Sequence, residues 1–434
     1  MRSTRTWLVL ACLAMAALVA APATASVPAA SPPSGPAPAV LPATESGPDT
    51  IPMGIAAQVD PLLTDPTLGG SVGAVVIDVV TGQIVYQQQA ATPRSLASND
   101  KVFTALAVLN LIGPETRLET TVVGGAGSVT ILGAGDPSLA TVSADGSSLT
   151  ELADQVAASV SGPLAVYYDT SLFAGPGIAP GWDGNYPELG VAAVVSALTV
   201  DRSRIPGTES RAEDPAYAAA QRFADLLIER GISVTEVSPG NASGEVIAST
   251  RSVPVATMIE TMLTESDNDM AEILAHLAGA RLTGVGTFES GAQASLQTLA
   301  DLGLPTSGAV IVDGSGLSYA NVASPNLLAS AVALAAGEDA PGWTWPLLVG
   351  LPVAGLTGTL VDRFGAPATE AAAGFVRAKT GTLIEVSTLS GTVVDRDGRL
   401  LAFAFMSDAT TDIPESRAAL DRAAAALAAC GCLT

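Results

Sequence analysis

The chain has 434 residues, a hydrophobic fraction of 48% with only 4% aromatic residues, and a formal net charge of −23. A chain of this length can bury a large core and hold more than one domain, and the scarcity of aromatic residues predicts a core of Ala, Val and Leu. The acidic balance argues against nucleic acid and anionic membrane surfaces as partners, because both repel a negatively charged chain.

The first residues have the pattern of an export signal. Arg2 and Arg5 precede an apolar run, and small residues at 23–25 supply a cleavage site, so we predict a signal peptide over residues 1–25. An uncleaved anchor is the alternative. Residues 26–50 are rich in Pro, Ala and Ser and predict a disordered linker. We therefore expect an exported protein whose folded part begins near Ile55.

A hairpin and a buried helix are expected next. Residues 71–79 and 82–88 carry β-branched side chains around a short turn. Ser98 and Lys101 precede the apolar run 102–111, whose helical pattern would place them one above the other on its first turn. A serine becomes a nucleophile when a base takes its proton, and a lysine can be that base once its pKa is lowered. Alone, such a pair is more often a helix cap followed by a solvated lysine.

The scarcity of lysine in the chain favours a catalytic role for Ser98 and Lys101. Lys101 and Lys379 are the only lysines, while 17 other basic positions are arginine. Arginine keeps its proton in proteins and lysine can lose it, so the chain reserves titratable amines for two positions. Asp100, between the serine and the lysine, is expected to pair with an arginine of the following segment or to face solvent.

The middle of the chain mixes strands and helices. Short strands are predicted at 120–123, 128–132, 164–168 and 194–201, and helices at 149–159 and 216–230. Two further helical patterns meet at Ser266-Asp267-Asn268, so Ser266 and Asn268 would lie at a corner facing a cleft. His276, the single histidine, is expected to be a surface or half-buried helix residue, and its solitude argues against a Ser-His-Asp triad or a catalytic metal.

The C-terminal part alternates as a sheet over 374–379, 386–394 and 400–406, and residues 416–429 predict a closing helix. The first of these strands leads into Lys379-Thr380-Gly381-Thr382. Cys430 and Cys432 could form a local bridge or link to another chain, and the sequence leaves both open. We expect no cofactor and no metal.

Three motifs follow one another in the chain: Ser98-x-x-Lys101, Ser266-Asp267-Asn268 and Lys379-Thr380-Gly381. Together they resemble the penicillin-recognising serine enzymes. Asp-Gly-Ser-Gly-Leu-Ser at 313–318 and Leu-Pro-Val-Ala-Gly at 351–355 narrow the resemblance. With them, the chain resembles the D-alanyl-D-alanine carboxypeptidase/endopeptidase family, the class C low-molecular-mass penicillin-binding proteins, over roughly residues 55 to 410.

The resemblance implies an α+β fold: a β-lactamase/transpeptidase-like antiparallel sheet flanked by helices, with an inserted smaller α/β domain. Residues 51–115 and 250–434 would form the discontinuous catalytic domain, and residues 116–249 the inserted domain. A second inserted domain, which the family often carries, is expected to be absent, because only the short stretch 202–214 stands where it would be.

The resemblance also implies a function. The chain would be a serine-type D-Ala-D-Ala carboxypeptidase that acts on peptidoglycan stem peptides and is acylated by β-lactams; endopeptidase activity and oligomeric state stay open. The implied catalytic residues are Ser98, Lys101 and Ser266, and the implied substrate-binding residues are Asn268, Lys379, Thr380, Gly381 and Thr382. The two lysines are expected to lower each other's pKa and leave Lys101 neutral.

The sequence supports two alternative functions less well. A class A-like β-lactamase needs a Glu-x-x-x-Asn loop after Ser-Asp-Asn, whereas the nearest candidate, Glu188, precedes Ser266 and lacks the Asn. An inactive cell-wall-binding module would not be expected to keep all three motifs intact.

Overall fold

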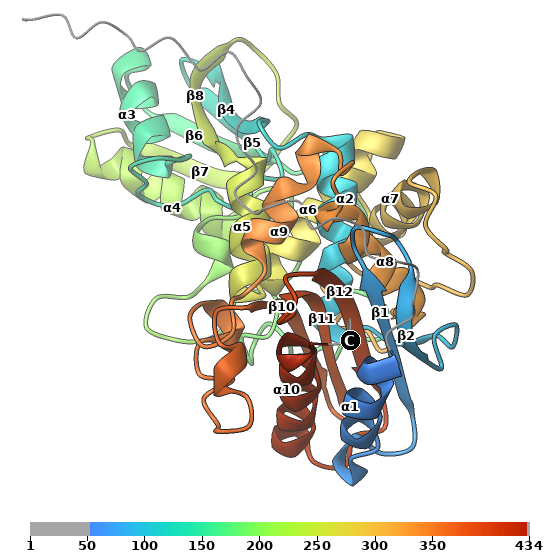
Figure 1. Ribbon diagram of the computed structural model, residues 1–434. Coiled ribbons are helices and arrows are strands. Elements are labelled where there is room, and N and C mark those ends of the chain that lie inside the picture. The colour runs from blue at the N-terminus through green and yellow to red at the C-terminus, as the bar shows by residue number, and fades with distance from the viewer. Residues whose placement is uncertain (1–52, 432–434) are drawn as a thin grey trace, which may run out of the picture. The chain divides into compact units, whose positions relative to one another are not determined.

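A computed structural model describes residues 53–431 (Figure 1). The expected signal peptide, the expected linker and Cys432 lie outside the described residues. Within residues 53–431, no helix combines the length and the apolar character needed to cross a membrane.

A five-stranded antiparallel sheet carries the Lys-Thr-Gly motif on its edge strand (Figure 1). In spatial order its strands are β10 (Val376–Leu383), β11 (Val386–Val394), β12 (Leu400–Ser407), β1 (Val72–Asp78) and β2 (Ile84–Gln88). Every residue of β1 is buried, because helices cover both faces of the sheet. The predicted β1–β2 hairpin and the C-terminal strands are therefore confirmed.

Helices form two layers around this sheet. The helices α1 (Met53–Leu63) and α10 (Ile413–Ala429) share one hydrophobic core with it, and α8 (Pro325–Ala336) and α2 (Asp100–Leu111) share the other. Packed around α2 are α5 (Val255–Glu265), α6 (Asn268–Thr283), α7 (Phe288–Asp301) and α9 (Trp345–Gly350). Short elements complete the frame: the pair β3 (Arg94–Ser95) and β9 (Val322–Ala323), and the 3₁₀ turns η1 (Pro66–Leu68), η2 (Ala97–Asn99), η3 (Asp201–Ser203), η4 (Gly342–Thr344), η5 (Gly358–Leu360) and η6 (Glu370–Ala372).

The part of the chain that follows α2 and precedes α5 forms a second five-stranded sheet. Its spatial order is β7 (Val234–Pro239), β6 (Leu164–Asp169), β5 (Ser128–Leu132), β4 (Arg117–Gly125) and β8 (Val246–Pro254). The strands β5, β6 and β7 are parallel, as expected for strands joined through helices, here α3 (Leu149–Ser159) and α4 (Pro215–Glu229). The α+β fold class is confirmed, while the division at residues 116 and 249 stays a prediction.

The strand expected at 194–201 is wrong. This apolar segment has no sheet partner and runs as irregular chain against a glycine-rich turn. The Gly135 N–H donates to the Ala197 carbonyl, and a side chain at Gly133 would meet the Ala197 backbone at 2.6 Å. Leu198 and Val200 are buried in the hydrophobic core of the second sheet, although their own backbone belongs to no strand.

The expectation for His276 is also wrong, because only 2% of this residue is exposed. Its ring lies 4.5 Å from the Phe288 ring and 5.2 Å from the Phe173 ring, centroid to centroid, and Nδ1 donates to the Glu272 carbonyl at 2.9 Å. Phe173 comes from the segment between β6 and α4, which covers this face of α6 and is distant in sequence. Burial lowers the pKa of His276 to about 4.

This burial predicts an acid-sensitive contribution to stability. Because the folded pKa lies below the ordinary histidine value of 6.5, the contribution is fully present above pH 6.5 and is lost as the pH falls toward 4. Between pH 7 and pH 4.5 the parent should lose about 2 to 3 kcal/mol more unfolding free energy than a His276→Gln variant. Urea unfolding at both pH values measures this difference, and equal losses in the two proteins would contradict it.

Candidate active site

The Ser98-x-x-Lys101 pair lies where the 3₁₀ turn η2 runs into α2. Ser98 belongs to the turn and is partly exposed, whereas Lys101 is on the first turn of α2 and is fully buried. The Lys101 Nζ lies 3.1 Å from the Ser98 Oγ, 2.8 Å from the Asn268 Oδ1 and 2.7 Å from the Ser315 carbonyl oxygen. One amine therefore connects three segments that are far apart in sequence.

Burial dominates the electrostatics of the two amines. It lowers the pKa of Lys101 to about 8, against the attraction of Glu272 and Asp313, which favour the charged form. Burial also lowers the pKa of Lys379 well below its usual range, and the charge of Lys101 adds to this. We expected repulsion between the two amines to leave Lys101 neutral. The repulsion instead lowers the pKa of Lys379, because the carboxyl groups near Lys101 favour its charged form.

The expectation for Asp100 is wrong as well. Its side chain is fully buried, and within residues 53–431 neither carboxyl oxygen has a hydrogen-bond partner. Burial raises its pKa well above the usual range, and the neighbouring carboxyls of Asp313 and Glu272 raise it further. Burial and these two carboxyls thus all disfavour the charged form of Asp100.

Glu272 holds the turn that faces Lys101. Its carboxylate accepts hydrogen bonds from the backbone N–H groups of Gly314, at 3.0 Å, and Ser315, at 2.7 Å. The Ser315 carbonyl in turn accepts from Lys101. Glu272 was not predicted as a site residue, because its contribution is to position a backbone group and no motif spacing indicates that.

The Ser-Asp-Asn corner joins α5 to α6 as predicted. Ser266 has a left-handed backbone with φ of 57° and ends α5, and the Asp267 carboxylate caps α6 by accepting from the Met270 N–H at 2.8 Å. This geometry turns Ser266 and Asn268 toward the same side of the corner. The Asn268 amide nitrogen donates to the Val191 carbonyl at 2.8 Å, while its oxygen faces Lys101.

Two arginines from the segment between β6 and α4 fix this corner. The Arg202 Nη1 lies 2.6 Å from the Asp267 Oδ2, and the Arg211 Nε lies 2.8 Å from the Asp269 Oδ2. Both side chains of the second pair are nearly inaccessible, at 7% and 3% exposure, so loss of either partner would leave a buried charge uncompensated.

Strand β10 brings the third motif to the same place. Lys379 is fully buried, and its Nζ donates to the Ser266 Oγ and to the Thr380 carbonyl, both at 2.8 Å. Gly381 allows the close approach: a Cβ there would lie 2.1 Å from the Thr388 Oγ1 and 2.9 Å from the Leu96 carbonyl oxygen. A larger residue would therefore push β10 away from the turn that carries Ser98.

The exposed groups of these motifs line one cavity of about 400 Å³. Its lining residues are Ser98, Ser266, Thr359, Arg363, Thr380, Thr382 and Arg417. Four of them were predicted, and the predicted Lys101 and Lys379 are buried behind it. Thr359, Arg363 and Arg417 were missed. Within the described residues, no group of three or more His, Cys, Asp or Glu side chains could hold a metal ion.

Comparisons with known proteins give a consistent result. A sequence profile of the D-Ala-D-Ala carboxypeptidase 3 (S13) family matches residues 55–209 and 205–427. Carboxypeptidase DacB of Mycolicibacterium smegmatis is 37% identical, over 98% of this chain and 95% of that protein. A D-alanyl-D-alanine carboxypeptidase of an Actinomadura species is 28% identical, over 81% of this chain and 80% of that protein.

The fold resembles a solved structure. Penicillin-binding protein 4 of Haemophilus influenzae superposes with a TM-score of 0.70 at 21% identity, covering 85% of this chain and 97% of that one. The same Haemophilus protein has also been solved in complex with a β-lactam. At this identity, the likeness shows that the two chains share a fold.

The Gly381 contacts predict that Gly381→Ala slows acylation by a fluorescent penicillin by about 100-fold, because displacement of catalytic groups by about 1 Å has effects of this size. The measurement is the second-order labelling rate. Gly342→Ala is the matched control, since a Cβ at Gly342 meets no atom within 4 Å. An unchanged rate for Gly381→Ala would show that β10 need not approach so closely.

Proposed function

The chain belongs to the D-Ala-D-Ala carboxypeptidase 3 (S13) family, and from this membership we propose that its carboxypeptidase activity proceeds through an acyl-enzyme on Ser98. The activity itself, hydrolysis of a D-Ala-D-Ala bond, follows from the family and from the carboxypeptidase relatives. The observation that carries the assignment of Ser98 is its 3.1 Å separation from a buried amine whose pKa is about 8.

We propose that Lys101 is the general base. A neutral lysine has two N–H donors and one lone pair. The Asn268 Oδ1 and the Ser315 carbonyl can only accept, so they take the two N–H groups and leave the lone pair for the Ser98 hydroxyl proton. Ser98 then attacks the carbonyl of the penultimate D-alanine, and water later hydrolyses the ester.

Ser266 would deliver the proton to the leaving amine. Its hydroxyl lines the cavity, and it accepts a hydrogen bond from the Lys379 Nζ behind it. Because the Ser266 Oγ accepts from Lys379, its own O–H remains free to donate into the cavity. The backbone N–H groups of Ser98 and Thr382 are the proposed oxyanion donors, in keeping with the position of both residues in the cavity wall.

The substrate, the inhibitors and the cellular location of this protein are also proposals. Peptidoglycan stem peptides are the proposed substrate and β-lactams the proposed inhibitors, supported by the carboxypeptidase relatives and by the β-lactam complex of the Haemophilus protein. Such a substrate lies outside the cytoplasm, which agrees with the export signal expected at residues 1–25.

Labelling with a fluorescent penicillin tests the nucleophile. Ser98→Ala should abolish covalent labelling while the melting temperature stays unchanged, because Ser98 is partly exposed and its removal leaves no large void. The stability of the parent's label separates the rivals: slow release supports a peptidase, fast release supports a β-lactamase, and no labelling supports an inactive wall-binding module. Labelling of Ser98→Ala at the parental rate would disprove the assignment.

The acylation rate should depend on pH through Lys101. Only the neutral amine accepts the proton, so with a pKa of about 8 the rate should rise about tenfold from pH 6 to pH 7 and level off above pH 8. Stopped-flow acylation by penicillin between pH 5.5 and 9.5 measures this. Lys101→Arg, which keeps the charge and removes the base, should lose acylation at every pH; a flat parental profile or an active Lys101→Arg variant would exclude Lys101 as the base.

A further inference from the structure

The catalytic cavity contains a positive charge that the three motifs do not supply. Arg417, on the second turn of α10, lines the same cavity as Ser98 and Ser266. Its Nε donates to the Thr382 Oγ1 at 3.2 Å. Within residues 53–431, no carboxylate forms an ion pair with Arg417, and its terminal Nη groups donate no hydrogen bond. In a chain with a net charge of −23, an uncompensated cation beside the nucleophile calls for an anionic ligand.

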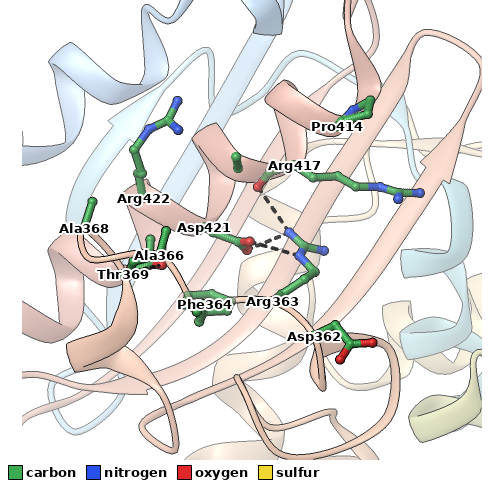
Figure 2. A pocket seen from close by; sticks show the side chains of 12 residues that line it. Asp362, Arg363, Phe364, Ala366, Ala368, Thr369, Pro414, Arg417, Asp421 and Arg422 are labelled. Atoms are coloured by element: carbon green, nitrogen blue, oxygen red, sulfur yellow. Dashed lines mark hydrogen bonds and ion pairs between the residues drawn. The ribbon is translucent and has the colours of Figure 1, made fainter.

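A second arginine keeps Arg417 in place. Arg363 forms a two-pronged ion pair with Asp421, with Nη2 2.6 Å from Oδ1 and Nε 3.0 Å from Oδ2. The same Nη2 donates to the Arg417 carbonyl at 3.2 Å. Figure 2 shows the Arg363 guanidinium between Asp421 and the backbone of Arg417, while the Arg417 side chain extends away from this pair. The charge of Arg363 is therefore neutralised by its partner, and that of Arg417 remains available.

Lys379 is poorly placed to meet the charge of a ligand. It is fully buried and does not line the cavity, and its Nζ donates to the Ser266 Oγ and the Thr380 carbonyl. Besides the paired Arg363, the cavity is lined by neutral hydroxyls: the Thr359 and Thr380 Oγ1 atoms lie 2.8 Å apart, and both residues line the cavity. One exposed guanidinium with adjacent hydroxyls suits a single carboxylate.

We propose that Arg417 binds the carboxylate of the leaving group and is thereby a specificity-determining residue of the carboxypeptidase reaction. This rests on the proposed acyl-enzyme at Ser98. The guanidinium draws the terminal carboxylate toward Thr382, which places the scissile carbonyl over Ser98 and the leaving nitrogen beside Ser266. Thr380 and Thr359 add neutral hydrogen bonds, and Lys379 serves Ser266 and not the carboxylate.

Two thioester substrates that differ by one charge test this assignment. N-benzoyl-D-alanyl thioglycolate carries a carboxylate on its leaving group, and its methyl ester does not. For Arg417→Gln, kcat/KM on the acid should fall by about 10- to 100-fold, the size expected for a lost charge-assisted hydrogen bond, and kcat/KM on the methyl ester should stay within twofold. Arg417→Lys, which keeps the charge, should recover part of the preference for the acid.

Arg422→Gln is the matched control. Arg422 lies one and a half turns further along α10 and pairs with Asp65 at 2.8 Å; it does not line the catalytic cavity. The Arg422→Gln substitution should therefore leave kcat/KM on both substrates unchanged. Equal losses of Arg417→Gln on the two substrates would overturn the proposal by showing that Arg417 only holds Thr382, and an intact preference for the acid would place carboxylate recognition elsewhere.

The parent protein separates this test from that of the proposed function. If the parent hydrolyses neither thioester and Ser98 is not labelled by penicillin, the acyl-enzyme proposal fails, and the carboxylate proposal fails with it. If the parent is active and Arg417→Gln keeps its preference for the acid, only the carboxylate proposal fails.

Discussion

The site depends on one buried amine that contacts three oxygen atoms. Lys101 contacts the Ser98 hydroxyl, the Asn268 amide and the Ser315 carbonyl, and each belongs to a different segment of the chain. Two of these oxygens can only accept, while the hydroxyl can either donate or accept. The same geometry therefore fits the ammonium, which donates three hydrogen bonds, and the free amine, which donates two and accepts one. A base that must gain and lose a proton in every cycle needs such an environment, because reorganisation at each transfer would raise the barrier.

Buried carboxyl groups hold the turn that carries the Ser315 carbonyl in place. Glu272 fixes the turn at Gly314 and Ser315, and Asp313 accepts from the Gly316 and Ser318 N–H groups and from the Trp182 Nε1. These acids also counteract part of the pKa depression that burial imposes on Lys101. Asp100 takes no part in the hydrogen bonding. Its carboxyl group still favours the charged form of Lys101, while burial and the neighbouring carboxyls raise the pKa of Asp100 itself.

Local patterns in the sequence predicted the β1–β2 hairpin, the helix that begins near Lys101 and the C-terminal strands, but they also predicted a strand at 194–201 that does not form. Helical periodicity predicted the corner at Ser266, and the scarcity of lysine indicated Lys379. Burial that depends on distant segments could not be predicted in this way. His276 and Asp100 were expected to reach solvent, since nothing near them in sequence shows what covers them. Arg417 carries no local signal either: it is one arginine on an amphipathic helix, and only the path of α10 beside β10 brings it to Thr382.

The segment between β6 and α4 contributes directly to the geometry of the proposed site. Val191, Arg202 and Arg211 each contact the Ser-Asp-Asn corner or the helix that it opens, through the Asn268 amide, the Asp267 cap and the Asp269 carboxylate. The Asn268 amide faces Lys101 with its oxygen and Val191 with its nitrogen, so the segment between β6 and α4 sets the amide orientation that Lys101 meets. The Arg211–Asp269 pair is almost completely buried, and a buried pair stabilises one arrangement mainly by making its disruption costly. The short stretch at 202–214 therefore has a structural role. Its residues Arg202 and Arg211 form ion pairs that hold the helix corner that carries Ser266.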